Sequence, residues 1–302
     1  MAWSTFVRVI GACLALAVLS ACGGLQSQSP PLSLAAARDA AHSGDLLYVS
    51  DQNTVEVYVF TYPGGRRVGT LTGFRFPEGL CADTSGNVYV TDQGAGEVVE
   101  YAHGGTSPIK TLKDSQYPIA CAVDPATGNL AVADESGDVS VYSNASGEPA
   151  VYKTPFVPLW CAYDDSGDLF ADSSGAPHIQ IAKLPKGGSS FESVSYGKRN
   201  NGAPAGLQWV SGHLAVGSAG PYQRSCCARI YRFRVSGTDA KPSGRTFIHG
   251  AMNDFFVEGG TVVTASGGHS IAFYAYPQGG RAQRVISDPG GNAYSVVVSA
   301  AP

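Results

Sequence analysis

Short apolar stretches alternate with turns rich in glycine and aspartate along most of the chain, with a period of about forty residues. Cys81, Cys121 and Cys161 are spaced 40 and 40 residues apart, and an acidic turn with a glycine follows each of them. An apolar stretch comes next each time, at 88–92, 130–134 and 169–173, with weaker copies at 214–218 and 262–266. A fixed period of this length is typical of repeat architectures.

A further alternating or aromatic stretch follows in each repeat, and a shorter one closes it. Five of the six copies run into a glycine-rich turn, where glycine supplies the positive φ of a tight hairpin. The six copies lie at 55–60, 97–102, 138–143, 178–183, 229–234 and 270–275. Four antiparallel strands per unit of about forty residues describe a β-propeller blade, so the sequence predicts six blades.

The two ends of this repeated region are complementary. It begins with a second-type strand, Leu46 to Ser50, and ends with a lone first-type strand, Asn292 to Ser299. Joined, they complete one blade and leave no exposed strand edge in the ring. We therefore predict an all-β fold, a six-bladed β-propeller over residues 45–302, in which the C-terminal strand completes the N-terminal blade.

The recurring pattern resembles the NHL-repeat propellers and their relatives in the senescence-marker/gluconolactonase superfamily. It has Pro before the inner strand, then Asp-x-x-Gly-Asn, then Val-Tyr-Val-x-Asp. The resemblance covers about residues 45–299 and is strongest over 75–175. It implies the fold, whereas function stays open because propellers carry many unrelated activities.

Phe76-Pro77-Glu78-Gly79-Leu80 is the sharpest functional pattern. By resemblance to gluconolactonase-like enzymes, Glu78 would ligate a divalent metal at the channel mouth, with Asn253, Asp254 and Asn292 at corresponding positions. Ca²⁺ takes six to eight oxygen ligands, and the other three blades bring the apolar Ile119, Leu159 and Ala205 to these positions. The set is thus partial, and the alternative is that these side chains cap turns and that the protein holds no cofactor.

Other chemistry-bearing residues give weaker patterns. Asp51, Asp92 and Asp134 end the second strand of three repeats, which predicts a repeated structural role in turns. The six histidines show no metal-ligand spacing, and no Gly-x-Ser-x-Gly motif occurs. We therefore assign no catalytic residue from the sequence.

The N-terminal segment has the features of an export signal. Arg8 precedes an apolar run from Val9 to Leu19, which is too short to span a membrane. Leu19-Ser20-Ala21-Cys22 resembles a bacterial lipobox, which implies cleavage after residue 21 and acylation of Cys22. We expect a signal peptide at 1–21 and a lipidated tether at 22–44, held on the bilayer by its acyl chains. By resemblance to Gram-negative sorting rules, Gly23 in place of Asp favours the outer membrane of the cell envelope.

The cysteines of the mature chain fall into two groups. Cys81, Cys121 and Cys161 are interpreted as occupying one position in three successive inner strands, where a small apolar side chain packs well. Pairing of two of them in an exported protein is the alternative. Cys226 and Cys227 are adjacent in a loop, and we hypothesise a strained vicinal disulfide there.

Cations are dense between residues 196 and 245. Arg232 and Arg234 alternate with Tyr231 and Phe233 and would face one side of a strand. They predict either a solvated blade edge or a face that binds an anionic ligand or an acidic partner.

Composition narrows the function further. The net charge of −4 provides no basic surface for phosphate backbones, so we expect no nucleic acid as a partner. The protein is best interpreted as an exported, membrane-anchored propeller with a binding or scaffolding role. Its partners would be the lipid bilayer, through acylated Cys22, and an unknown envelope protein or small molecule. The alternative is a metal-dependent hydrolase of the gluconolactonase type.

Overall fold

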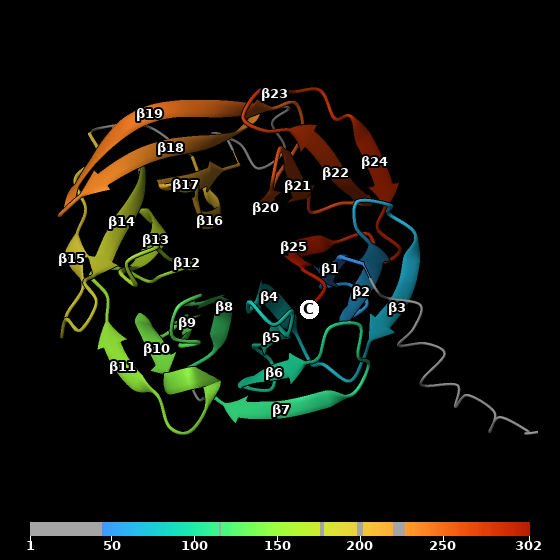
Figure 1. Cartoon of the computed structure of the whole chain (residues 1–302), viewed down its shortest axis with the longest axis horizontal. Helices are drawn as coiled ribbons and strands as arrows, with labels where there is room; N and C mark the ends of the chain where they lie inside the picture. Colours follow the sequence, from blue (N-terminus) through green and yellow to red (C-terminus); the bar gives the residue numbers. More distant parts are fainter. Residues whose placement is uncertain (1–43, 115, 176–177, 198–201, 220–226) are drawn as a thin grey trace, which may run out of the picture.

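The computed structural model describes residues 44–114, 116–175, 178–197, 202–219 and 227–302. These residues form six sheets, each built mainly of antiparallel strands, arranged as a ring around one axis (Figure 1). The predicted six-bladed β-propeller is therefore confirmed. No helix of the described residues has the length and apolar character needed to cross a membrane.

The strands follow one another outward from the axis within each sheet. The first three sheets are β25 (Ala293–Ser299), β1 (Leu46–Asp51), β2 (Glu56–Thr61) and β3 (Arg67–Leu71); β4 (Pro77–Ala82), β5 (Val88–Asp92), β6 (Glu97–Tyr101) and β7 (Pro108–Lys113); and β8 (Pro118–Val123), β9 (Leu130–Asp134), β10 (Asp138–Tyr142) and β11 (Ala150–Lys153). A 3₁₀ turn, η1 (Ser143–Ala145), joins β10 to β11.

The remaining three sheets complete the ring. They are β12 (Trp160–Tyr163), β13 (Leu169–Gly175), β14 (His178–Leu184) and β15 (Glu192–Ser193); β16 (Pro204–Val210), β17 (His213–Ser218), β18 (Ala228–Ser236) and β19 (Asp239–Ile248), to which β23 (Gly279–Gly280) adds in parallel; and β20 (Asp254–Glu258), β21 (Thr261–Ala265), β22 (Ser270–Ala275) and β24 (Arg284–Ser287).

The ring closes through the pairing of the two ends of the propeller. β25 pairs antiparallel with β1, with Leu46 opposite Ser299 and Leu47 opposite Val298. The last strand of the chain is thus the inner strand of the first blade, as predicted. This closure covers the edge that β1 would otherwise expose.

The acidic turns after the inner strands have a shared geometry. Asp83 accepts hydrogen bonds from the backbone N–H groups of Ser85 and Asn87, and Asp164 accepts the equivalent pair from Ser166 and Asp168. The intervening Gly86 has a φ of 82°, in the left-handed region that favours glycine. The repeated Asp-x-x-Gly pattern is therefore explained by turn formation.

Three aspartates of the second strands anchor the segment that enters the inner strand. Asp92 accepts hydrogen bonds from the backbone N–H groups of Arg75 and Phe76, at 2.9 and 2.7 Å. Asp51 accepts the N–H of Asn292 at 2.7 Å, and Asp172 that of Trp160 at 3.1 Å. These contacts support the structural role that the sequence predicts for Asp51 and Asp92, whereas Asp134 accepts a hydrogen bond from the Ser140 hydroxyl at 2.9 Å.

Candidate ligand-binding channel

The six inner strands β25, β4, β8, β12, β16 and β20 surround the axis, each in contact with the next. They approach closely where small residues allow it. A Cβ added to Gly79 on β4 would lie 2.6 Å from the Cα of Ala120 on β8, so only glycine fits there. Because the strands are so close, a few large side chains determine the shape of the channel between them.

One end of the channel, where the inner strands begin, is a polar mouth formed by Glu78, Gln52 and Asn292. The Gln52 side chain links the other two, since its Nε2 donates to Glu78 Oε1 at 3.3 Å and its Oε1 accepts from Asn292 Nδ2 at 3.3 Å. The Ser50 hydroxyl donates to the backbone carbonyl of Glu78 at 2.5 Å. The structure therefore brings Glu78 and Asn292 to one place, as predicted, through a residue that the sequence analysis did not select.

The carboxyl group of Glu78 is buried at this mouth. Its burial raises the pKa to about 7, an effect that a hydrogen bond from the Tyr294 hydroxyl opposes. The same burial and the neighbouring Glu78 raise the pKa of Tyr294 well above its ordinary value. Near neutral pH both the protonated and the ionised form of the Glu78 carboxyl are therefore populated.

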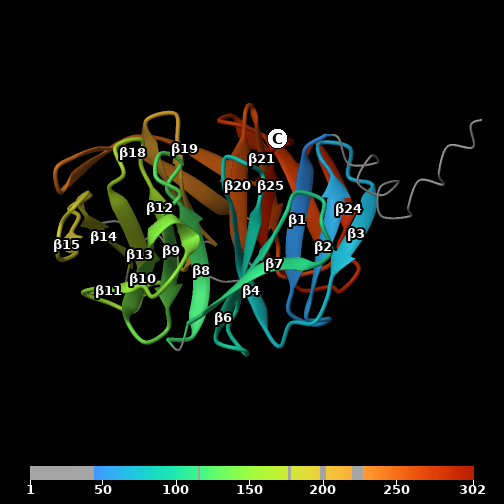
Figure 2. The same ribbon diagram turned by 60° about the horizontal axis from the view of Figure 1, so that its bottom comes forward.

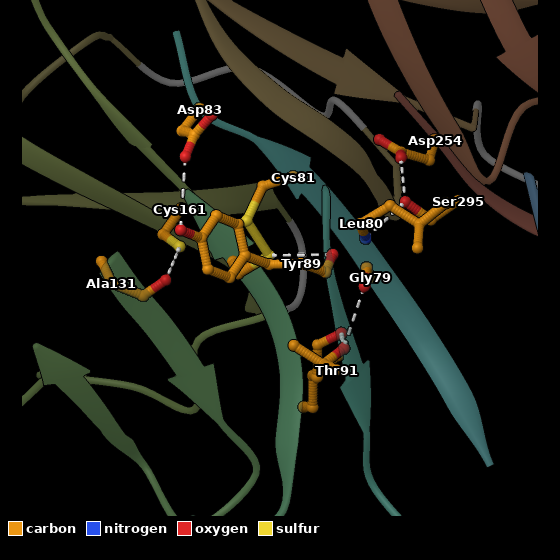
Figure 3. Close-up of a disulfide and its surroundings, with 12 residues drawn as sticks. Gly79, Leu80, Cys81, Asp83, Tyr89, Thr91, Ala131, Cys161, Asp254 and Ser295 are labelled. Carbon is orange, nitrogen blue, oxygen red and sulfur yellow. Dashed lines mark hydrogen bonds between the residues drawn. A yellow bond between two sulfur atoms is a disulfide. The ribbon is translucent and has the colours of Figure 1, made fainter. Parts of the chain in front are cut away.

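Asp254 lies deeper, and its carboxylate ties three inner strands together. Its Oδ2 accepts from the Ser295 hydroxyl at 2.6 Å and from the Val296 N–H at 3.1 Å, both on β25. Ser295 Oγ in turn accepts the Leu80 N–H of β4 at 3.1 Å (Figure 3). Burial raises the pKa of Asp254 to about 7. Its hydrogen bonds give it the structural role that the sequence analysis kept open for this residue.

The position of Asp254 also departs from the repeat. In four blades the acid lies on the second strand, as its last residue in Asp51, Asp92 and Asp134 and within the strand in Asp172. In the blade of β20, Ala265 ends the second strand and pairs directly with Asp254 on the inner strand. In this blade the acid therefore lies on the inner strand, nearer the channel axis, instead of on the second strand.

Asn253 does not join the polar mouth. Its Nδ2 donates to the Ala293 carbonyl at 3.3 Å and so links the entry of β20 to β25. Among the described residues, no group of three or more His, Cys, Asp and Glu side chains is placed to hold a metal ion. A hard cation such as Ca²⁺ needs six to eight oxygen ligands. The polar mouth provides one carboxyl group and two amide groups, and Asp254 lies apart from it in the channel. These residues therefore supply fewer oxygen ligands than a metal site of the gluconolactonase type needs.

A stacked aromatic pair separates the polar mouth from the rest of the channel. The rings of Tyr294 and Trp160 stack with their centroids 5.8 Å apart and their planes at 26°. Tyr294 belongs to β25 and Trp160 to β12, which lie three strands apart in the ring of six and hence on opposite sides of the axis. The pair therefore spans the channel, and we call these two rings the plug.

Beyond the plug, the channel holds a cavity of about 220 Å³, the apolar pocket. All six inner strands contribute to it. Its buried floor includes Leu80, Trp160 and Asp254, while Tyr163, Trp209 and Phe256 near the other end are half-exposed. The described residues that line it are Leu80, Cys81, Ala82, Cys121, Ala122, Val123, Pro125, Trp160, Cys161, Ala162, Tyr163, Leu207, Gln208, Trp209, Asp254, Phe255, Phe256, Val296 and Val297.

A disulfide crosses the wall of this pocket. Cys81 on β4 and Cys121 on β8 are joined with an S–S distance of 2.07 Å and a Cα–Cα distance of 5.6 Å (Figure 3). Of the two predictions for these residues, packing of free thiols and pairing of two of them, pairing is confirmed for Cys81 and Cys121. Cys161 is a buried thiol without a disulfide partner.

The three cysteines do not occupy one equivalent position, which corrects the sequence analysis. Cys121 and Cys161 each precede the turn aspartate of their repeat by three residues, whereas Cys81 precedes Asp83 by two. The sulfurs of Cys121 and Cys161 accordingly lie 3.8 Å from equivalent carbonyls of the preceding blade, those of Tyr89 and Ala131. Because side chains alternate along a strand, Cys81 points the other way, toward β8.

The two arginines selected from the sequence have different surroundings. Arg232 is half-buried, and its guanidinium lies 5.6 Å from the ring centroid of Tyr276 in the next blade. It also covers Gly244 of β19, where a Cβ would overlap it. Arg234 is exposed. Arg232 thus packs between blades, and a face for an anionic partner that includes both arginines stays a prediction.

Two predicted sites lie outside the described residues. Cys22 and the whole signal peptide precede residue 44, so lipidation stays a prediction. The vicinal disulfide of Cys226 and Cys227 also stays a prediction, because Cys226 is outside the described ranges.

Sequence reasoning missed the residues that shape the channel most. None of Tyr294, Gln52, Trp209 and Trp160 belongs to the motifs described from the sequence. A large aromatic residue near the start of an inner strand, among neighbours that are small or glycine, was the signal available. This signal does not identify the aromatic residue that lies opposite, on the other side of the channel axis.

Comparison with known proteins supports the fold. The NHL repeat family model matches residues 74–101, which include β4, β5 and β6. No curated protein matches the chain.

Three solved structures illustrate the likeness. A chain of a nidogen/laminin complex is 16% identical with a TM-score of 0.68, covering 85% of this chain and 99% of that chain. Hydrazine synthase of Kuenenia stuttgartiensis is 12% identical with a TM-score of 0.57, over 76% of this chain and 73% of that one. U3-55K is 14% identical with a TM-score of 0.54, over 72% and 70%. At these identities only the fold is shared, so the chain is a six-bladed β-propeller that carries an NHL repeat.

Proposed function

We propose that this protein is an exported, membrane-anchored binding module whose ligand occupies the central channel. The observation that supports the proposal is the apolar pocket of about 220 Å³, which the six inner strands enclose and which is open at one end. Concave and mostly apolar sites of this kind are where proteins bind small molecules.

The anchor is part of the proposal and rests on the sequence alone. Leu19-Ser20-Ala21-Cys22 resembles a lipobox, and acylated Cys22 would attach the propeller to a bilayer of the cell envelope. Partition of the expressed protein into a detergent phase, lost in Cys22→Ser, is the expected behaviour.

A metal-dependent hydrolase remains the alternative function, and metal binding distinguishes it from a binding module. The melting temperature of the full chain should be measured in EDTA and in millimolar Ca²⁺, for the native protein and for Glu78→Gln. A ligand at one hundred times its Kd adds about 2.7 kcal/mol of stability, or several degrees. We expect no shift, because Glu78 at the polar mouth and Asp254 in the apolar pocket lie apart and already accept hydrogen bonds from the protein.

For each protein the melting temperature in Ca²⁺ is compared with that in EDTA, so a direct effect of Glu78→Gln on stability cancels. The exposed Glu148→Gln serves as the matched control. A Ca²⁺-dependent rise that persists in Glu148→Gln and disappears in Glu78→Gln would refute the binding module in favour of the hydrolase.

A further inference from the structure

We infer that the apolar pocket binds a small uncharged aromatic molecule of one or two rings. This inference rests on the proposed function, since it names the ligand class of the same channel. It follows from the size of the pocket, the character of its walls and the state of its polar groups.

The size of the pocket sets the scale of the ligand. Its volume is about 220 Å³. An apolar cavity of about 150 Å³ inside another protein is known to take up benzene. The pocket is therefore large enough for one ring with substituents or for two fused rings.

The walls offer aromatic rings at several heights. Trp160 and Phe255 lie at the buried end, and Tyr163, Trp209 and Phe256 lie near the open end. The Trp209 ring is fixed by stacking on Phe170, with centroids 5.9 Å apart, and by a 2.8 Å hydrogen bond from its Nε1 to Asp165. Rigid rings favour flat ligands that stack on them or meet their edges.

The polar side chains that line the pocket already form hydrogen bonds within the protein, so they offer few partners to a charged ligand. Asp254 accepts hydrogen bonds from Phe255, Ser295 and Val296. The Gln208 amide donates to the Val257 carbonyl at 3.2 Å and accepts the Val257 N–H at 2.8 Å. An anion would lose its hydration without gaining a partner, which is costly. A cation would meet one acid among the described lining residues, Asp254, whose oxygens already accept hydrogen bonds and whose burial raises its pKa to about 7. The ligand is therefore uncharged.

The tryptophans of the chain provide a direct readout. Of the three tryptophans, Trp160 and Trp209 line the pocket, whereas Trp3 belongs to the expected signal peptide and Trp3→Phe removes its signal from any unprocessed chain. We would label this full chain with 5-fluorotryptophan, reconstitute it in phosphatidylcholine nanodiscs and follow the two ¹⁹F resonances. The probes are toluene and indole, with benzoate and protonated phenylethylamine as charged counterparts of similar size.

The expected result is a saturable shift of both resonances with toluene and indole and none with the charged probes. Filling the pocket with Ala122→Leu should weaken toluene binding by at least about tenfold, because the added carbons occupy the space of the ring. The matched control Ala150→Leu, on the exposed outer strand β11, should bind as the native chain does. The control also separates pocket binding from partition into the lipid.

A second readout does not depend on fluorine. A bound probe stabilises the folded chain, so it should protect the backbone amides of the inner strands from hydrogen exchange, followed at the peptide level by mass spectrometry. Both readouts are measured on the chain with the native pocket, so they test the inference even if Ala122→Leu folds poorly.

The outcomes separate this inference from the proposed function. Saturable binding of benzoate or phenylethylamine, sensitive to Ala122→Leu and without binding of toluene, would overturn the ligand class and leave the channel as the binding site. Absence of any shift or protection with all four probes would overturn both.

Discussion

Two neighbouring interfaces between blades each contain a cysteine at an equivalent position, but their covalent chemistry differs. Between β4 and β8, Cys81 and Cys121 form a disulfide. Between β8 and β12, Cys161 takes the place of Cys121, but the counterpart of Cys81 is Ala122, two residues before the turn aspartate Asp124. Cys161 therefore faces an alanine and stays reduced. A shift of one residue along a strand decides which blade a side chain faces.

The largest expected effect comes from making the first interface like the second. Cys81→Ala removes the cross-link and leaves Cys121 as a thiol, the state of Cys161. A disulfide that closes a loop of 40 residues stabilises by about 4 kcal/mol in the chain-entropy model. We expect a loss of that size in guanidinium unfolding under non-reducing conditions.

The native protein with a dithiol reductant is the internal control, because it should lose stability similarly while Cys81→Ala does not change further. If the unfolding midpoint of Cys81→Ala equalled that of the oxidised native protein, the prediction would be contradicted.

The opposite change makes the second interface like the first. Ala122→Cys places a thiol opposite Cys161, and we expect a second disulfide between the two positions. Its gain should be smaller, about 2 kcal/mol, because engineered cross-links seldom reach the ideal value. Non-reducing peptide mapping and thermal unfolding would measure it.

Ala162→Cys is the matched control for that variant. Ala162 occupies the same place before Asp164 but faces β16, whose described residues include no cysteine. Its introduced thiol should stay reduced. Pairing of the thiol introduced at position 122 with Cys121 instead of Cys161 would show that the strand alternation is misassigned.

The smallest effect concerns the thiol itself. Cys161 is buried at 4% exposure and packs as a small apolar group. Cys161→Ala should cost about 1 kcal/mol through lost contacts and a small void. A loss as large as that of Cys81→Ala would mean that Cys161 takes part in the disulfide chemistry of the pocket. Guanidinium unfolding of Cys161→Ala and Cys81→Ala under the same conditions distinguishes the small loss from the large one.

The sequence predicts the architecture well because each blade repeats the same local rules. The Asp83 turn, the positive φ of Gly86 and the pairing of Leu46 with Ser299 all follow from local patterns and the complementarity of the two ends. The cysteine spacing was deceptive for a physical reason. The turn aspartates Asp83 and Asp124 are 41 residues apart, so equal spacing of Cys81 and Cys121 conceals a change of strand face.

The candidate site was less predictable, since it forms across the ring. The sequence indicated Glu78 and Asn292 at one mouth but not Gln52, which joins them. The plug of Tyr294 and Trp160 needs strands more than 130 residues apart to lie on opposite sides of the axis. Neither local periodicity nor turn chemistry records that relation.

The exit of the N-terminal segment has a consequence for how a ligand could reach the pocket. The described chain begins at Gly44, beside Leu46, which pairs with Ser299 at the end of β25. That is the rim at which the apolar pocket opens, and Figure 2 shows the C-terminus at the same rim. Under the proposed lipid anchor, the 22 residues from 23 to 44 separate the acylated Cys22 from the propeller, and a random coil of that length has a reach of roughly 25 Å. An apolar compound dissolved in the bilayer would then travel only this short distance through water before entering the propeller.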